Sequence, residues 1–206
     1  MTGTPATTAV LLIGYQNDYL SEGGALNEVI EENVQESGML DRTLSLIDAL
    51  KESDIPVINT PILFSSDYSE LKEPQGLMQT IKEVGAFQRG KWGGETIPQL
   101  LEYGDRITHM PGKTWFNSFQ GTNLKEFLDE KNIKTLVVAG VVTSLCIDST
   151  ARAAADLGYE TIILSDCTGS RTMAEQDFYC SSIFTLYAKT ITTDELLEQL
   201  TLSVPA

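Results

Sequence analysis

The chain has 206 residues, 42% of them hydrophobic and 21% charged, which is the balance of a globular protein able to bury a sizeable core. Its formal net charge of −15 argues against nucleic acid and anionic membranes as partners, because both would be repelled. No stretch approaches the roughly 18 uninterrupted apolar residues of a transmembrane helix. Residues 1–8 carry neither a basic residue nor an apolar run, so we expect no signal peptide and a cytoplasmic location.

Apolar runs and helical periodicities alternate along the chain. In chain order, the pattern predicts a strand at 8–13, a helix at 33–51, a strand at 56–60, loops with one or two short helices over 61–104, a strand at 106–109, a helix at 120–131, a strand at 134–139, a helix at 143–157, a strand at 161–164, a helix at 172–187, a strand ending at 191 and a helix at 194–200. Thr172 with Glu175 resembles a capping box, and Thr193 is expected to cap the last helix. Strands that are apolar throughout are covered on both faces. We therefore predict an α/β fold, a mostly parallel sheet between helices in one domain over residues 1–206.

The chain has three cysteines and one histidine. The cysteines are odd in number and form no CxxC pair, and His109 has no second imidazole near it, so we expect no metal site and no cofactor. We interpret His109 as structural, Cys167 as a packed core thiol and Cys180 as a core or interface thiol. Free thiols fit a reducing compartment.

The strongest local signal is the segment AGVVTSLC, residues 139–146. A strand ends, a glycine turns the chain, and Cys146 follows where a helix is predicted to begin. Unpaired N–H groups and the partial positive charge of a helix N-terminus stabilise a thiolate, and such N–H groups can hold an oxyanion. From its position alone, Cys146 is either a nucleophile or a small buried thiol packed under the helix.

Three other segments could lie at the ligand-binding edge of the sheet. Lys113 follows the turn 110–112 and precedes several aromatic residues; it could stabilise a thiolate, or simply be a solvated loop charge. The polar residues 15–18 follow the first predicted strand, and could face a ligand or brace their loop. Residues 90–94 could form a flexible rim or a plain loop. Neither a GxGxxG fingerprint after a strand nor a GxxxxGK[ST] loop occurs in the sequence.

Taken together in order, four segments resemble the isochorismatase-like cysteine hydrolases, a family that includes nicotinamidases, N-carbamoylsarcosine amidase and ureidoacrylate hydrolases. They are AVLLIGYQNDY (9–19), GKWGGETIPQL (90–100), GKTWFNSFQGT (112–122) and GVVTSLCIDST (140–150). Each segment alone is weak, but the ordered set is specific, and the resemblance covers nearly the whole chain.

The resemblance implies a three-layer α-β-α fold with a six-stranded, Rossmann-like sheet. It places the nucleophile at Cys146 and the catalytic lysine at Lys113. It also implies a cis peptide bond between Val141 and Val142, and an oxyanion hole formed by the N–H groups of Val142 and Cys146. Members are usually homodimers or homotetramers. The pocket for a small-molecule substrate is expected to be shaped by Trp92, Trp115, Phe119 and Tyr19.

The chain departs from the family pattern at two places. Gly14 occupies the position of the family's catalytic aspartate; it could be natural to a subfamily, an engineered change or a mark of lost activity. Asp18 is a candidate replacement base, although it matches a different aspartate of the family's loop. Residues 59–62 lack the histidine of the metal-binding pair found in nicotinamidases, which argues against nicotinamide as the substrate.

The sequence thus predicts a cysteine hydrolase that cleaves a C–N bond of a small amide, ureido or carbamoyl compound through a Cys146 thioester. The alternative is a catalytically impaired or non-catalytic small-molecule-binding member of the same fold, suggested by Gly14. Vinyl-ether hydrolysis, the reaction of isochorismatases, relies on the aspartate and is disfavoured.

Overall fold

A computed structural model describes residues 5–200 and contains one six-stranded sheet. The strand order is β3-β2-β1-β4-β5-β6, and every neighbouring pair is parallel. The predicted α/β fold is therefore confirmed. The strands are β1 (Thr8–Ile13), β2 (Val57–Thr60), β3 (Ile107–His109), β4 (Thr135–Val141), β5 (Glu160–Gly169) and β6 (Lys189–Ile191).

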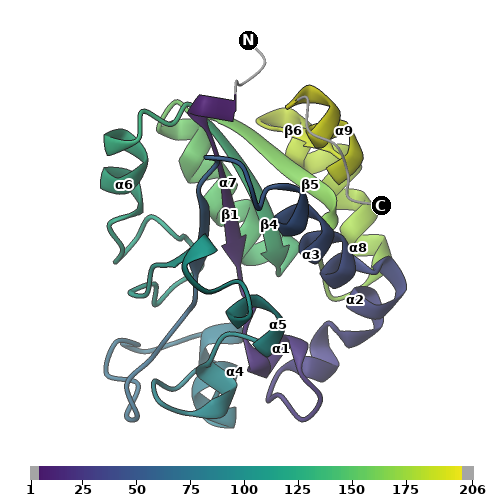
Figure 1. Cartoon of the computed structure of the whole chain (residues 1–206). Helices are drawn as coiled ribbons and strands as arrows, with labels where there is room; N and C mark the ends of the chain where they lie inside the picture. Colours follow the sequence, from purple (N-terminus) through teal and green to yellow (C-terminus); the bar gives the residue numbers. More distant parts are fainter. Residues whose placement is uncertain (1–4, 201–206) are drawn as a thin grey trace.

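Helices cover both faces of the sheet, and short helices lie beyond the carboxyl ends of the strands (Figure 1). One face packs against α3 and α9, and the other against α6 and α7. Short α1, α4 and α5 lie near the ends of the β1 and β4 arrows in Figure 1. The helices are α1 (Asn17–Leu20), α2 (Glu31–Ser37), α3 (Met39–Ala49), α4 (Leu77–Val84), α5 (Pro98–Leu101), α6 (Leu124–Glu130), α7 (Asp148–Asp156), α8 (Met173–Phe178) and α9 (Thr193–Gln199).

The central strand β1 shows why an uninterrupted apolar run marks a doubly covered sheet. Successive side chains of a strand point to opposite faces. Val10 and Leu12 accordingly join the core under α3 and α9, whereas Leu11 and Ile13 join the core under α6 and α7. All residues of β1 are buried.

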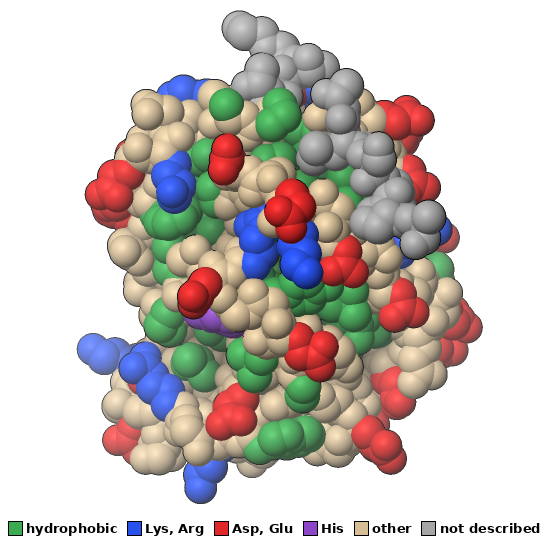
Figure 2. Space-filling model, viewed as in Figure 1, with side chains coloured by type: hydrophobic (Ala, Val, Ile, Leu, Met, Phe, Trp, Pro, Cys, Tyr) green, Lys and Arg blue, Asp and Glu red, His purple; other side chains and the backbone are tan. Residues whose placement is uncertain are grey.

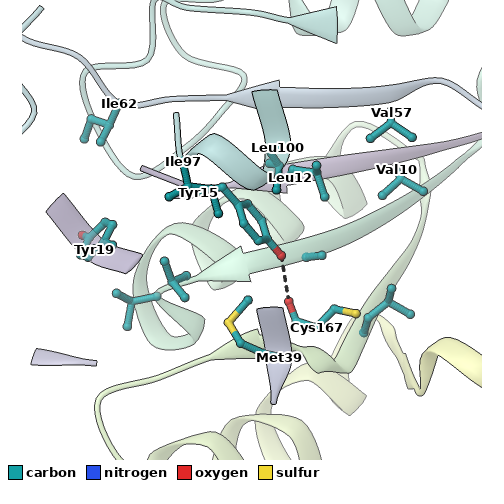
Figure 3. Close-up of a cluster of buried hydrophobic side chains, with 14 of the residues drawn as sticks. Val10, Leu12, Tyr15, Tyr19, Met39, Val57, Ile62, Ile97, Leu100 and Cys167 are labelled. Atoms are coloured by element: carbon teal, nitrogen blue, oxygen red, sulfur yellow. Dashed lines mark hydrogen bonds between the residues drawn. The ribbon is translucent and has the colours of Figure 1, made fainter. Parts of the chain in front are cut away.

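Tyr15 anchors the chain just after β1. Its ring lies among Leu12, Ile97 and Leu100 in Figure 3. Its hydroxyl contacts Thr43 Oγ1 at 2.7 Å and donates to the Cys167 carbonyl at 3.4 Å. Burial is the main cause that raises the pKa of Tyr15 well above its ordinary value, so this phenol stays protonated and structural.

Several helix boundaries differ from the sequence predictions. The helix predicted over 33–51 is divided at Gly38, whose φ of 64° is left-handed. The helix predicted from 172 ends at Phe178 and continues as a wider turn over Tyr179–Ile183. The last helix is capped by Thr192 rather than Thr193, because Thr192 forms a reciprocal capping box with Glu195.

Within residues 5–200, no helix is long and apolar enough to cross a membrane. Acidic side chains are spread over the face shown in Figure 2 rather than gathered in a single patch. The sequence contains 29 acidic and 14 basic residues.

Candidate active site

The carboxyl ends of β1 and β4 lie side by side where the strand order reverses. Chain segments leave this point toward opposite sides of the sheet, which opens a place for ligands in such folds. Gly14 follows β1, and the turn that carries Cys146 follows β4. The peptide bond between Val141 and Val142 is cis, as the resemblance implied.

Cys146 lies in a π-helical turn, Thr143–Ile147, that leads directly into α7. The sequence predicted an ordinary helix start here. Such wider turns are frequent at functional sites. Next to this turn, the N–H of Val142 has no hydrogen-bond acceptor within the described residues 5–200.

Lys113 and Cys146 are brought together from segments 33 residues apart. Lys113 Nζ donates to Cys146 Sγ at 3.3 Å, with relative exposures of only 1% and 4%. Among residues 5–200, no carboxylate forms an ion pair with Lys113. A buried ammonium needs compensation from its surroundings, and Cys146 Sγ is the side-chain atom to which Lys113 donates.

Gln16 holds the segment that positions Lys113. Its side-chain amide donates to the carbonyls of Ile62 (2.9 Å) and Gly94 (2.8 Å), and its oxygen accepts from the Ile62 N–H at 2.9 Å. Leu63 N–H in turn donates to the Lys113 carbonyl at 3.0 Å. These bonds tie the loop after β1 to the backbone that carries Lys113.

Tyr19 is buried near the thiol. Its ring packs against Phe87 with centroids 4.8 Å apart. Burial raises the pKa of Tyr19 well above its ordinary value, and the nearby Cys146 and Asp18 raise it further. The phenol therefore stays protonated at neutral pH and is available as a hydrogen-bond donor.

Asp18 braces the loop instead of contacting the thiol. Its two oxygens accept from the backbone N–H groups of Ala25 (3.0 Å) and Phe87 (2.6 Å). Neither Lys113 nor Cys146 forms a hydrogen bond with it in the described part of the chain. Bonds from two backbone donors favour a structural role for this carboxylate.

Replacing Asp18 by asparagine should destabilise the fold. The amide would turn an NH₂ group toward one of the two backbone N–H donors, a loss of about 1–3 kcal/mol. Equilibrium unfolding in denaturant measures this loss. The control is Asp54→Asn on an exposed loop, which should change stability by less than about 0.5 kcal/mol. Equal effects of the two changes would contradict the bracing role.

Gly14 does not leave an empty space where a carboxylate could sit. Its φ is +79°, in the left-handed region. A Cβ at this position would lie 2.6 Å from the Val141 carbonyl oxygen and 2.8 Å from Val141 Cγ2. The backbone of β4 therefore occupies the room that a side chain at position 14 needs.

The predicted pocket aromatics lie in three different settings. Trp115 is half-buried and packs against the core cluster that contains Tyr19 and Val142. Trp92 is 51% exposed, which suits a rim. Phe119 stacks on Tyr159, which directly precedes β5, so this contact places its ring at the amino end of the sheet.

His109 contacts Asn59 rather than the thiol, with 3.2 Å between its Nδ1 and Asn59 Nδ2. Burial lowers its pKa from the ordinary value. In the part of the chain that the structure describes, no group of three His, Cys, Asp or Glu side chains is arranged to hold a metal ion. The metal-free site stays a prediction.

The three cysteines should differ sharply in reactivity. Burial raises the pKa of Cys167 to about 12 and that of Cys180 to about 11, so both are protonated at pH 8. Since the thiolate is the reactive form, iodoacetamide should label Cys146 alone in the folded protein and all three cysteines after unfolding. Peptide mass spectrometry measures this. Labelling of Cys167 or Cys180 as fast as that of Cys146 would contradict the expectation.

Comparisons with known proteins agree with this fold. A family model for the isochorismatase domain matches residues 8–195. The ureidoacrylate amidohydrolase RutB of Rhizobium rhizogenes is 26% identical over 177 residues, covering 80% of this chain and 71% of that protein.

Two solved structures share the fold. A cysteine hydrolase from Pseudomonas syringae pv. phaseolicola aligns with a TM-score of 0.85 at 20% identity, covering 98% of this chain and 95% of that chain. N-carbamoylsarcosine amidase from Thermoplasma acidophilum aligns with a TM-score of 0.70 at 21% identity, covering 91% and 97%. At these identities, the structural likeness establishes the fold alone. Because the domain match spans most of the chain, this protein belongs to the isochorismatase family.

Proposed function

We propose that this protein hydrolyses a C–N bond of a small amide, ureido or carbamoyl compound, with Cys146 as the nucleophile. The observation that carries the proposal is the buried contact between Lys113 Nζ and Cys146 Sγ at 3.3 Å, in the turn that follows β4. A thiolate held by an ammonium in a site nearly closed to water is an activated nucleophile.

In the first half of the reaction, the thiolate attacks the carbonyl carbon and forms a C–S bond. The carbonyl oxygen becomes an oxyanion, which the N–H groups of Val142 and Cys146 are proposed to stabilise. The unpaired Val142 N–H supports this assignment, because a donor without an acceptor is available to a ligand.

Proton transfer is assigned to Lys113. Its ammonium gives a proton to the leaving nitrogen as the C–N bond breaks, which releases an amine and leaves a thioester on Cys146. The neutral Lys113 amine then takes a proton from the water that attacks the thioester. The acid leaves, and the ammonium–thiolate pair is restored. A lysine can serve as base beside a nucleophile, as serine–lysine pairs do.

No carboxylate is required in this scheme. Gly14 has no side chain, and both oxygens of Asp18 accept backbone hydrogen bonds. Tyr19 and Trp115 are proposed to line the substrate pocket, with Trp92 at its rim. Relatives named for ureidoacrylate and N-carbamoylsarcosine hydrolysis support ureido and carbamoyl compounds as the first substrates to test.

The second candidate function is non-catalytic binding of a small molecule on the same fold. The lack of room for a side chain at Gly14 favours this second function, because the family's aspartate cannot be accommodated there without backbone movement. In that case the compounds that bind would be recovered unchanged, and Cys146→Ala would bind them as well as the native chain does.

The proposal also includes a cytoplasmic homodimer or homotetramer. Phe178 and Leu186 are apolar side chains that are 55% and 77% exposed, and a second copy of the chain could cover them. Light scattering coupled to size-exclusion chromatography tests this, and a monomer at micromolar concentration would exclude it.

The function is tested by measuring ammonia or amine release from a panel of small amides, ureido acids and carbamoyl amino acids. We expect turnover of at least one class by the native chain and none by Cys146→Ala. Equal, measurable rates for the two proteins on any compound of the panel would rule the proposal out. Calorimetric binding of the same panel then separates a binding protein from a hydrolase whose substrate class lies outside the panel.

A further inference from the structure

The side chain of Gln176 connects the Cys146 turn to the neighbouring strand. Gln176 lies on α8 and is 95% buried, with 5% relative exposure. Its Oε1 accepts from Thr143 Oγ1 at 2.6 Å. Its Nε2 donates to Thr168 Oγ1 at 2.9 Å and to the Ser165 carbonyl at 3.2 Å, and it also contacts Cys180 Sγ at 3.4 Å.

These contacts fix the orientation of the Gln176 amide. The Ser165 carbonyl can only accept a hydrogen bond, so the NH₂ group must face β5. The amide oxygen is then left for Thr143, whose hydroxyl must donate. Thr168 Oγ1 accepts from Gln176 and donates to the Leu164 carbonyl at 2.9 Å. The direction of each hydrogen bond in this series is therefore fixed.

An irregularity in β5 presents the acceptors to Gln176. Val138 pairs with Ile163, but Gly140 pairs with Thr168, so the register between β4 and β5 shifts just before the Cys146 turn. Such irregularities bend a strand and redirect its groups, and they are common beside active sites. Here the Ser165 carbonyl and the Thr168 hydroxyl both bond to the amide of Gln176.

The start of α8 is fixed mainly by residues of its own segment. Thr172 caps the helix by accepting from the Glu175 N–H at 3.2 Å. The Glu175 carboxylate accepts from Ser170 Oγ and pairs with Arg171. Arg171 is the largest cause that lowers the pKa of Glu175 to about 2, and hydrogen bonds from Ser170 and from Ser144, a residue of the Cys146 turn, lower it further. Most of the bonds that hold the start of α8 thus come from its own segment, and Thr143 is held by position 176.

We infer that Gln176 is a positioning residue for Cys146, acting through Thr143, an inference that rests on the function proposed above. Thr143 is the first residue of the π-helical turn and is fully buried. Its hydrogen bond to Gln176 fixes the start of the turn, and Cys146 three residues later meets Lys113 Nζ. Without the acceptor, the buried Thr143 hydroxyl must find another partner, and the turn moves with it.

The test measures the reactivity of Cys146 rather than turnover. Gln176→Met removes the acceptor at similar size, and Thr143→Val removes only the donor. Each should slow alkylation of Cys146 by iodoacetamide at pH 7 by at least about tenfold, because displacements of about 1 Å cost on the order of 10² in rate at such sites. The pH–rate profile should also move to higher pH as the sulfur loses contact with Lys113.

The double variant Gln176→Met/Thr143→Val should be no slower than Gln176→Met alone, because Gln176→Met has already removed the hydrogen bond that Thr143→Val breaks. Cys180→Ser is the matched control, since it alters a weaker contact of the same Gln176 amide and should alkylate like the native chain. Thermal unfolding is recorded for every protein. If Gln176→Met does not fold, the alkylation rate of Thr143→Val still tests the positioning role of the hydrogen bond between Thr143 and Gln176.

Lower melting temperatures with unchanged alkylation rates and pH profiles would mean that Gln176 is merely structural and would overturn the inference. Additive effects in the double variant would also overturn it. Because alkylation needs no substrate, this result is independent of turnover. Slowed alkylation in both variants without hydrolysis of any compound would support the inference and count against the proposed function.

Discussion

Replacing Lys113 by methionine should lower turnover by roughly 10²- to 10⁴-fold, the usual contribution of a positioned acid–base group. Methionine has similar length and suits a buried position, so packing changes little. It removes both the positive charge that stabilises the thiolate and the proton donor for the leaving nitrogen. Initial rates on the best substrate of the panel, with melting temperatures recorded in parallel, measure the effect.

Lys51→Met provides the control for this change. Lys51 is exposed just after α3, so the same chemical substitution should leave turnover within about twofold of the native rate, given the small effects of surface changes. Lys113→Arg separates charge from proton transfer. It keeps a positive charge but cannot readily give up a proton, so we expect a slow enzyme whose Cys146 is still alkylated. Near-native turnover in Lys113→Met would show that another group manages the protons.

Introducing a side chain at Gly14 should destabilise the protein instead of restoring a catalytic aspartate. Gly14→Ala and Gly14→Asp force an L-residue into left-handed backbone at φ +79° and place Cβ 2.6 Å from the Val141 carbonyl oxygen. The left-handed conformation costs about 1–2 kcal/mol and overpacking about 1–3 kcal/mol, so we expect a loss of about 2–5 kcal/mol. The displaced atoms belong to β4 just before the Cys146 turn, so turnover should fall as well.

Gly23 is a matched control for Gly14. It has the same φ of +79°, but a Cβ there would meet no atom within 4 Å. Gly23→Ala should therefore lose only the conformational part, about 1–2 kcal/mol. Chemical denaturation of the four proteins gives the comparison. A gain of activity in Gly14→Asp at native stability would mean that the chain lost a working carboxylate at this position, and that the lysine alone does not suffice.

The sequence predicted those parts of the site that follow directly from strand ends. Cys146 and the residues after β1 could be located because apolar runs mark β4 and β1, and parallel strands present their carboxyl ends at one edge. The cis bond at Val141–Val142 followed from the family resemblance. Lys113 lies outside the helices and strands and is 33 residues from Cys146 in the chain. Their contact at 3.3 Å could therefore be found only in the folded structure.

Other features depend on long-range contacts that no local pattern encodes. In the sequence, Gln176 resembles any polar residue of a helix. Its partner Thr143 lies 33 positions earlier, so no local pattern indicates the contact. The lack of room for a side chain at Gly14 is caused by the backbone of Val141, which is distant in sequence. Phe119 was predicted to line the pocket from its proximity to Lys113 in the chain, but it stacks on Tyr159. The break at Gly38 was missed because the apolar spacing that predicted this helix lies entirely after Gly38, between Met39 and Leu50.

The central claim is that Cys146 forms a covalent thioester during hydrolysis. Mass spectrometry of the native chain, quenched in acid during turnover of its best substrate, tests this most directly. We predict an added mass equal to the acyl part of the substrate on the peptide that contains Cys146, absent in Cys146→Ala and lost on treatment with hydroxylamine. Steady turnover without such an adduct, or with equal turnover by Cys146→Ala, would contradict the account.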